Sequence, residues 1–419
     1  MSAAIVVVCM PERGHLQRLL PLIAALAARG RAVHVMTDAG FAPDVARAGA
    51  RPLDLFARCP LDAADATSIP VPSRYVSFAA TYAETVTAEI AALAPAVVVY
   101  DTFAVIAPLV ARRLGVPYVN VCAGHAALPA RAVARLRNDP RVATSDACHA
   151  AVRRLREVYG MTGASPFSYV DGVSPYLNLY CEPPQFLDAA DRQALEPLAF
   201  FGSLPAEAGK VADSAAATGA RGDLRHRRCG GGSTPPRISP ARLRVYVSFG
   251  TVIWRYYARA AYTAFGVLAD ALAGLDAEVV MSLGRHDLEA GRRAALARPH
   301  LRVESYVDQW TVLQACDVFV THHGLNSTHE AIFHRVPMLS YPFFDDQPGL
   351  ALRCQELGLA LPLGAEPRTP LAADAVARAT RRLVDERDAF AARLAEARAW
   401  ELATIAARPA VIDRLLALS

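Results

Sequence analysis

The chain contains 419 residues, of which 53% are hydrophobic, so we expect two or three domains with ample apolar side chains for buried cores. This composition excludes a chain that is disordered throughout. The 44 basic and 40 acidic residues leave a formal net charge of +4, which is too balanced to indicate a nucleic-acid or membrane partner.

The apolar runs have the length of β-strands rather than of membrane helices. The longest, such as residues 5–10 and 96–100, are far below the roughly 20 residues that a helix needs to cross a bilayer. We expect no signal peptide, because no basic residues precede the first apolar stretch, which continues into Pro11-Glu12-Arg13. The eight cysteines form no C-x-x-C pair, which favours reduced thiols and a cytoplasmic location.

The first 40 residues predict a strand, a helix and a second strand. Residues 5–9 form a continuous apolar run, typical of a strand buried on both faces of a parallel sheet. After a predicted loop at 10–14, leucine and isoleucine recur at helical spacing until Gly30, which favours the end of a helix. A strand at 32–36 completes a βαβ unit, which implies a parallel sheet.

Similar units recur along the chain. The first half has further predicted strands at 96–100 and 117–121. After residue 243 we expect a strand at 244–248, a loop at 249–259, a helix at 260–275 and a strand at 277–281. Strands at 318–321 and 338–341 follow. Two doubly wound halves are therefore predicted.

The two halves are separated by a segment that is a poor core-former. Residues 205–240 are rich in Ala, Gly, Ser and Pro and predict a flexible interdomain linker. The glycines at 230–232 are followed by Thr234-Pro235-Pro236 and not by a helix start, which favours a hinge over a phosphate loop. At the end of the chain, residues 371–418 have a helical pattern, and Pro409 is expected to break it near Ala407 and leave a short final helix at 410–418.

Polar residues are densest at 306–361. A strand at 318–321, a tight turn at 322–324 and a helix at 325–333 precede the strand at 338–341 and a loop with Asp345-Asp346-Gln347. The free N–H groups and dipole of the helix N-terminus suit a diphosphate with no metal. Helix capping is the alternative role for Asn326, Ser327 and Thr328. The histidines at 322, 323, 329 and 334 form no H-x-x-x-H pair, so we expect no metal site.

Several segments of both halves carry a family resemblance. THHGLNSTHEA at 321–331, with VPMLSYPFFDDQ at 336–347, resembles the nucleotide-sugar signature of glycosyltransferase family 1, the UDP/TDP-glycosyltransferases. The stretch ERGHLQRLLPLIAALAARGRAVHVMTDAGF at 12–41 is similar to the opening of that family, and VYVSFGT at 245–251 and VDQWTVLQACDVFVTH at 307–322 extend the similarity. The resemblance implies an α/β protein of GT-B architecture, with two Rossmann-like doubly wound parallel-sheet domains facing across a cleft.

The same resemblance implies a different binding role for each domain. We expect an acceptor-binding domain at 1–204, the linker at 205–240 and a nucleotide-sugar-binding domain at 241–400. A C-terminal helix at 401–419 is expected to pack back on the first domain. The aromatic residues of the less similar stretches on the acceptor side suggest a small, fairly apolar acceptor, although packing in the core is their commoner role.

Two residues of the first half match catalytic positions of the family. His15 matches the histidine that acts as general base on the acceptor, and imidazole groups titrate near neutral pH, as this task requires. Asp101, at the end of a predicted strand, is then the carboxylate that orients His15. Apart from the resemblance, His15 would be read as a surface residue of a helix N-terminus and Asp101 equally as a helix cap.

The second half supplies the residues that match the donor site of the family. The positions matched to the diphosphate are His322, Gly324, Asn326 and Ser327, with Ser248 and Thr251 as further candidates. Glu330 matches the residue that binds the ribose hydroxyls, Val307 and Gln309 match the segment beside the nucleobase, and Asp346 and Gln347 match the pair that binds the donor sugar.

The chain departs from the family signature where His323 and Arg335 replace glycines and Arg18 replaces a proline. A side chain at His323 is expected to crowd the phosphate turn or to add a donor to it, and Arg335 is expected on a loop. None of these changes removes a chemical group, so we expect the donor site to be retained.

The resemblance implies an inverting, metal-independent glycosyltransferase that moves a sugar from a UDP- or TDP-sugar to a hydroxyl of a small-molecule natural-product acceptor. No cofactor is expected besides the nucleotide-sugar co-substrate, and no nucleic acid or membrane partner. One alternative is a non-catalytic nucleotide-sugar-binding partner of another transferase, which the presence of His15 disfavours. The other is a nucleotide-sugar epimerase of the same fold, which the Asp346-Gln347 pair disfavours.

Overall fold

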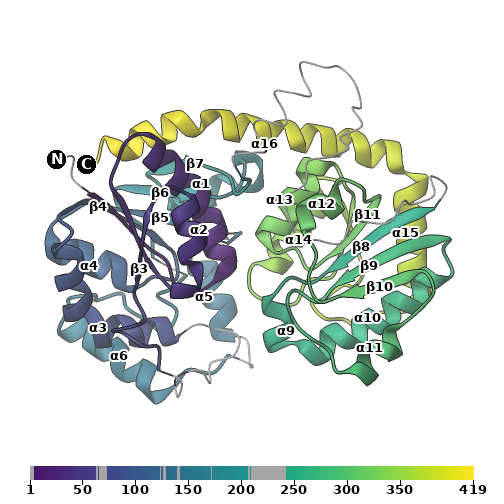
Figure 1. The fold of residues 1–419 in the computed structure, drawn as a ribbon, viewed down its shortest axis with the longest axis horizontal. Helices are drawn as coiled ribbons and strands as arrows, with labels where there is room; N and C mark the ends of the chain where they lie inside the picture. Colours follow the sequence, from purple (N-terminus) through teal and green to yellow (C-terminus); the bar gives the residue numbers. More distant parts are fainter. Residues whose placement is uncertain are drawn as a thin grey trace. The chain divides into compact units, whose positions relative to one another are not determined.

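The computed structural model describes residues 4–62, 65, 73–122, 124–125, 129–138, 142–170, 172–205, 208 and 242–419 (Figure 1). The chain divides into two compact units. Unit 1 comprises Met1–Pro205 and Ala403–Ser419, and unit 2 comprises Ala206–Leu402. The linker predicted at 205–240 lies outside the described residues except for Pro205 and Ala208.

Unit 1 contains a parallel sheet in which the described strands number seven, in the order β3-β2-β1-β4-β5-β6-β7. The strands are β1 (Ala4–Val8), β2 (Val33–Thr37), β3 (Arg51–Asp54), β4 (Pro95–Asp101), β5 (Tyr118–Cys122), β6 (Leu177–Tyr180) and β7 (Leu198–Phe200). β1 pairs in parallel with both β2 and β4, so the strand order reverses there, and such switch points are where α/β sheets bind ligands. The four strands predicted in this half correspond to β1, β2, β4 and β5.

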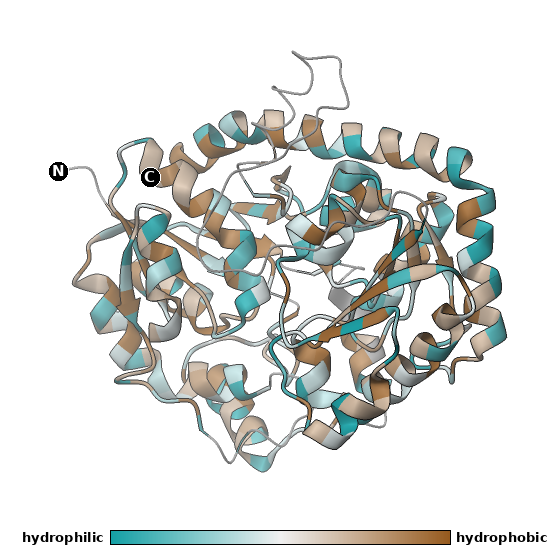
Figure 2. Ribbon diagram, turned by 45° about the vertical axis from the view of Figure 1, so that its right-hand side comes forward, coloured by the Kyte–Doolittle hydropathy of each residue, from teal (hydrophilic) through white to brown (hydrophobic). Residues whose placement is uncertain are grey.

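Helices connect these strands, as a parallel sheet requires. They are α1 (Arg13–Ala28), α2 (Ala42–Arg47), α3 (Arg74–Ala91), α4 (Ile106–Leu114), α5 (Pro129–Asn138), α6 (Asp146–Glu157) and α7 (Ala189–Ala194), with short 3-10 turns η1 (Ala39–Phe41) and η3 (Pro184–Phe186). All five residues of β1 are buried, as its continuous apolar sequence predicts. Figure 2 shows the hydrophobic residues gathered along the strands and on the inner faces of the helices.

Unit 2 repeats this plan with a parallel sheet of six described strands in the order β10-β9-β8-β11-β12-β13. The strands are β8 (Leu243–Ser248), β9 (Ala277–Ser282), β10 (Leu301–Glu304), β11 (Val318–Thr321), β12 (Met338–Ser340) and β13 (Ala360–Pro362). The helices are α9 (Val252–Tyr256), α10 (Ala258–Ala273), α11 (Ala290–Leu296), α12 (Gln309–Leu313), α13 (Leu325–His334), α14 (Gln347–Glu356) and α15 (Ala373–Asp385). The switch point of this sheet lies between β8 and β11. The two-domain α/β prediction is confirmed.

The loop prediction for residues 249–259 is wrong in part, because this segment contains the short helix α9. Ile253 and Trp254 of α9 are buried, and the Trp254 ring packs edge-on against Phe265 of α10 at 5.0 Å between centroids. A helix of five residues has too little periodicity to be visible in a sequence, and tertiary packing stabilises it.

The predicted helix break at Pro409 is also wrong, since α16 (Arg387–Leu416) is continuous through that residue. Proline removes one backbone donor and strains the preceding turn. Contacts in unit 1 on both sides of Pro409 offset this cost. Arg408 donates from Nε to the carbonyl oxygen of Phe201 at 2.8 Å, and Arg414 donates to the carbonyl oxygen of Leu198 at 2.7 Å. The following residues Val411, Ile412 and Leu415 are buried.

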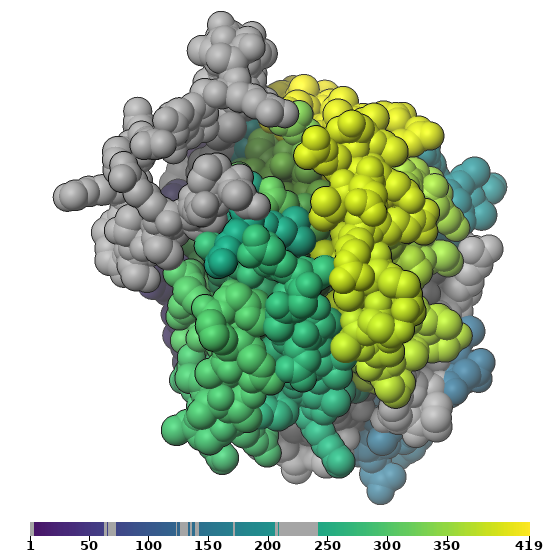
Figure 3. All heavy atoms as spheres, turned by 90° about the vertical axis from the view of Figure 1, so that its right-hand side faces the viewer, coloured from purple at the N-terminus to yellow at the C-terminus, as the bar shows by residue number. Residues whose placement is uncertain are grey.

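The first part of α16 belongs to unit 2, where it follows α15. Figure 3 shows this C-terminal segment, in yellow, lying along the green elements of unit 2. In the part of the chain that the structure describes, none of the helices combines the length and the hydropathy of a membrane span.

Candidate active site

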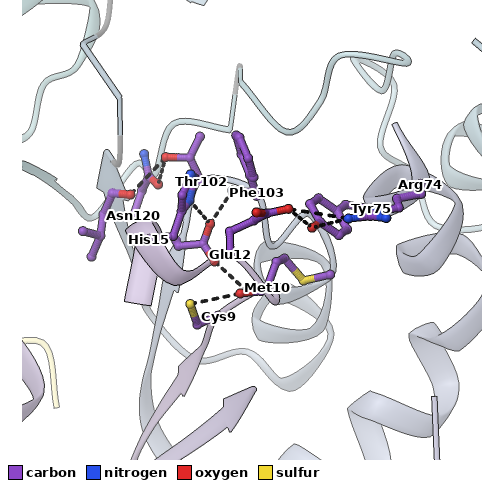
Figure 4. A network of polar contacts seen from close by, with 11 residues as sticks. Cys9, Met10, Glu12, His15, Arg74, Tyr75, Thr102, Phe103 and Asn120 are labelled. Carbon is purple, nitrogen blue, oxygen red and sulfur yellow. Dashed lines mark hydrogen bonds and ion pairs between the residues drawn. The ribbon is translucent and has the colours of Figure 1, made fainter. Parts of the chain in front are cut away.

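The two residues predicted to be catalytic lie in contact in unit 1. His15 lies in the first turn of α1, directly after β1, and Asp101 is the last residue of the neighbouring strand β4. Nδ1 of His15 lies 2.9 Å from Oδ1 of Asp101 (Figure 4). The Asp101 side chain is fully buried, whereas 14% of the His15 side chain is exposed. The pair therefore stands at the carboxyl edge of the sheet, beside its switch point.

Backbone groups hold the Asp101 carboxylate in place. The N–H of Met10 donates to Oδ2 at 2.8 Å, and the N–H of Phe103 donates to Oδ1 at 2.8 Å. Hydrogen bonds of this kind stabilise a buried negative charge and fix its direction. A carboxylate at Nδ1 favours the tautomer with the proton on that nitrogen, which leaves the lone pair of Nε2 to accept a proton.

Aromatic side chains pack beside this histidine. The ring of Phe103 lies 4.1 Å from the His15 ring between centroids, and Tyr75 and Tyr169 lie 5.9 Å and 5.4 Å from Phe103. Tyr75 is buried, and its hydroxyl donates to Oε1 of Glu12 at 2.7 Å (Figure 4). These aromatic residues of the acceptor half therefore pack in the core of unit 1. Phe103 contacts both this cluster and the ring of His15.

In unit 2, His322 directly follows β11 and lies against two glycines. A Cβ atom on Gly324 would come within 2.4 Å of Nε2 of His322, and one on Gly250 within 2.8 Å, so neither position has room for a side chain. Burial lowers the pKa of His322 to about 4, and a hydrogen bond with the backbone of Ser248 opposes this shift. The imidazole is therefore neutral near pH 7, so it can donate a hydrogen bond to a ligand without carrying a positive charge.

The N-terminus of α13 follows at once. Its N-cap is Gly324, which offers no side chain to accept the hydrogen bonds of the first-turn N–H groups. The hydroxyl of Thr328 donates a hydrogen bond to the carbonyl oxygen of Gly324 at 3.2 Å. Ser327 lies near Gln309 of α12, and Asn326 is half-buried in the same turn. A helix N-terminus without a capping side chain, at the carboxyl edge of a parallel sheet, suits an anion.

Three of the predicted donor-site residues form one hydrogen-bonded cluster between α12 and α13. Nε2 of Gln309 lies 2.7 Å from Oε2 of Glu330 and 3.2 Å from Oγ of Ser327. Burial raises the pKa of Glu330 to about 7, while the hydrogen bond from Gln309 opposes the shift. Val307, shortly before α12, is half-buried.

Sequence reasoning missed the neighbour of Val307. Tyr306 follows β10 and is 53% exposed, and the guanidinium of Arg285 lies 4.1 Å from the centroid of its ring. Arg285 comes shortly after β9, the strand that pairs with β10. An aromatic residue directly before Val307, one of the positions matched to the segment beside the nucleobase, was the signal available in the sequence.

The remaining donor-site residues lie between the end of β8 and the start of α9, and at the start of α14. Gln347 is buried at the start of α14, and its Oε1 accepts the N–H of Phe343 at 3.0 Å, so its carbonyl group holds the loop after β12. Asp346 is half-buried beside it. Ser248 is buried, and its Oγ accepts the N–H of Gly250 at 3.3 Å, whereas Thr251 is exposed at the start of α9.

The expected effect of His323 on the phosphate turn is wrong. His323 has a φ of +59° and is fully buried. Its Nε2 lies 2.8 Å from Oγ of Ser340, and its Nδ1 lies 3.2 Å from Oγ1 of Thr328, so the ring packs inside unit 2. Arg335 also has a φ of +59° and is the exposed C-cap of α13. Both positions thus have the left-handed backbone that favours glycine.

Comparison with known proteins finds relatives of this chain. Residues 266–417 match the family model described as erythromycin biosynthesis protein CIII-like, C-terminal domain. The elloramycin glycosyltransferase of Streptomyces olivaceus is 29% identical over 420 residues, which cover 91% of this chain and 92% of that protein. The solved structure of the kitacinnamycin glycosyltransferase covers 99% of this chain and all of its own, with 25% identity and a TM-score of 0.72.

Other curated relatives match shorter segments. A UDP-glucosyltransferase of Bacillus subtilis (strain 168), YdhE, is 35% identical over 114 residues, and a zeaxanthin glucosyltransferase of Pantoea ananas is 31% identical over 117 residues. The matched part spans only about a quarter of the length of these relatives, 27% and 26%. The resemblance predicted from the sequence is confirmed: the chain has the GT-B fold and is similar to glycosyltransferases of the natural-product type.

Proposed function

We propose that this protein transfers a sugar from a UDP- or TDP-sugar to a hydroxyl group of a small-molecule natural product, with inversion at the anomeric carbon. The observation that carries the proposal is the contact of 2.9 Å between His15 and the buried carboxylate of Asp101. The similarity to the elloramycin glycosyltransferase over most of both chains supports the same activity.

In the proposed reaction His15 accepts the proton of the acceptor hydroxyl at Nε2, while Asp101 stabilises the imidazolium that forms. The acceptor oxygen forms a bond to the anomeric carbon as the bond from that carbon to the diphosphate oxygen breaks. The nucleoside diphosphate leaves with the electron pair. A single displacement of this kind inverts the configuration.

Unit 2 would stabilise the charge on the leaving group. The N–H groups of the first turn of α13 and the neutral imidazole of His322 supply hydrogen-bond donors, which are most effective when fixed in advance. A solved structure of the glycosyltransferase VinC in complex with dTDP shares the fold, with a TM-score of 0.63. The dTDP bound to VinC supports a thymidine nucleotide as the donor nucleotide of this protein. We propose that no metal takes part, because the donors of α13 and His322 can take up the charge of the diphosphate without one.

We also infer that the protein acts in the cytoplasm. The described cysteines form no disulfide, and most of them are buried. This is the usual state of cysteine in a reducing compartment.

The proposal is tested by offering dTDP-glucose and UDP-glucose with simple phenols and following products by mass spectrometry, for the wild type and for His15→Ala and Asp101→Asn. We expect His15→Ala to lower kcat about 10³-fold and Asp101→Asn by a similar order, with nucleotide affinity retained. His149→Ala is the matched control, because His149 is exposed on α6.

Other outcomes distinguish the alternatives. Nucleotide binding without turnover in the wild type would indicate a non-catalytic partner, and release of a nucleotide-sugar isomer would indicate an epimerase. Transfer that EDTA abolishes and Mg²⁺ restores would contradict the metal-free mechanism.

A further inference from the structure

Unit 1 contains a second histidine paired with a buried carboxylate at the same edge of the sheet. Nδ1 of His125 lies 2.8 Å from Oε2 of Glu182. The Glu182 side chain is fully buried and 12% of the His125 side chain is exposed, nearly the same burial as in the pair of His15 and Asp101. His125 comes shortly after β5 and Glu182 shortly after β6, and these strands pair in parallel. The chain thus repeats one arrangement at two places.

The carboxylate of Glu182 is also held in position. The hydroxyl of Tyr180, a buried residue at the end of β6, donates to the same Oε2 atom at 2.5 Å. The Tyr180 ring in turn packs edge-on against Phe200 of β7 at 5.9 Å between centroids. A carboxylate fixed in this way sets both the tautomer and the orientation of the histidine that it contacts, with the proton on Nδ1.

The strand order places the two pairs along one edge. The order β1-β4-β5-β6 puts His15 and Asp101 after the first two strands and His125 and Glu182 after the next two. Neighbouring strands lie about 4.8 Å apart, so the two pairs are separated by roughly 10 Å. Thr102, directly after β4, donates to Oδ1 of Asn120 in β5 at 3.2 Å and links the ends of the strands between them.

We propose that His125, oriented by Glu182, is a second acceptor-binding residue, which receives a hydroxyl of the acceptor other than the one that His15 deprotonates. This inference rests on the proposed transfer reaction. At His125 a hydroxyl donates to Nε2, the nitrogen that Glu182 does not engage, and no covalent bond changes there. The site therefore selects acceptors with two hydroxyl groups held apart by a rigid ring system.

The test compares 2,6-dihydroxynaphthalene with 2-naphthol as acceptors, using dTDP-glucose and UDP-glucose as donors. For the wild type, His125→Leu, His125→Gln and Tyr180→Phe, the ratio of kcat/KM for the diol to that for the mono-ol is measured. We expect His125→Leu to lower this ratio about tenfold, mainly through the KM of the diol, which is the effect of losing one hydrogen bond. His125→Gln, which keeps a polar group at this place, should restore part of the ratio, and Tyr180→Phe should give an intermediate ratio. His149→Ala is the control.

A ratio that His125→Leu leaves unchanged would overturn the proposal. So would an equal loss with both acceptors, because that is the result expected if the pair only supports the fold.

A second measurement does not depend on turnover and separates this proposal from the proposed function. Diethyl pyrocarbonate modifies accessible neutral histidine, and mass spectrometry reports each site. We expect His125 to be modified in the wild type and to be protected by 2,6-dihydroxynaphthalene more than by 2-naphthol. If the wild type glycosylates neither naphthol, the proposed function fails for this acceptor class, and protection of His125 by the diol still supports the binding role. A His125 that is unreactive, or unprotected by the diol, overturns that role.

Discussion

Nε2 of His323 lies 2.8 Å from Oγ of Ser340, although the backbone of His323 has the left-handed conformation that favours glycine. The family signature has glycine both here and at Arg335, which adopts the same φ of +59°. The side chains differ in their surroundings: the His323 ring is fully buried and hydrogen-bonded, whereas Arg335 is exposed. The two positions should therefore respond in opposite ways to a return to glycine.

Arg335→Gly should stabilise unit 2 by about 1 kcal/mol, because a non-glycine residue in the left-handed region costs about 1–2 kcal/mol and part of this gain is lost to the freer unfolded chain. Arg335 also lowers the pKa of Arg398, after the larger effect of burial, so removal of a like charge acts in the same direction. Unfolding by guanidinium chloride measures the change. A midpoint that falls would contradict the assignment of strain to this C-cap.

His323→Gly should destabilise the protein by about 2 kcal/mol, despite the same relief of backbone strain. The substitution leaves a cavity and removes the ring that contacts the hydroxyls of Ser340 and Thr328, and these buried losses outweigh the gain. The same denaturation experiment applies. A variant as stable as the wild type would show that the buried ring contributes less than its hydrogen bonds indicate.

Gly324→Ala should weaken the binding of dTDP or UDP by about 10- to 100-fold. Gly324 has a φ of −63°, which alanine adopts without strain, so the only direct effect is a Cβ atom 2.4 Å from Nε2 of His322. The ring must move away from the N-terminus of α13, and misplaced donors bind a phosphate poorly.

Isothermal titration calorimetry measures this affinity, and Gly266→Ala is the matched control. Gly266 lies inside α10, and a Cβ atom added there would meet no neighbouring atom within 4 Å, so this substitution should leave nucleotide affinity unchanged and raise stability by about 1 kcal/mol. Equal affinities for the two variants would remove His322 from the nucleotide site.

The stability of the wild type should fall more steeply with acid than that of His322→Gln. Because folding lowers the pKa of His322 to about 4, its contribution is full above the unfolded value near 6.5 and is lost as the pH falls toward 4. Between pH 7 and pH 5 the difference in unfolding free energy between the two proteins should shrink by about 2 kcal/mol. Glu330 titrates in both proteins, so its effect largely cancels. Parallel pH profiles would contradict a neutral, buried His322.

The central strands of both sheets, β2-β1-β4-β5 and β9-β8-β11-β12, could be predicted from the sequence because each is a local pattern. A continuous apolar run such as that of β1 is stable when it is buried between two layers of helices, and this location is indicated by the run itself. The order of strand, turn and helix around Gly324 is equally local, and the motif match placed the donor residues on it. His15 and Asp101 were paired through the family resemblance, and the structure places them 2.9 Å apart.

What the sequence determined by itself is thus the α/β plan, the position of most strands and the segments that carry the candidate site. Only the tertiary structure decided the features that depend on residues far apart in the chain. Contacts with Phe201 and Leu198 keep α16 continuous through Pro409, and burial makes His322 neutral. His125 and Glu182 are 57 residues apart, and no local pattern joins them. The physical reason is that strand pairing brings such residues together, and the free energy of each contact depends on the burial that the whole unit provides.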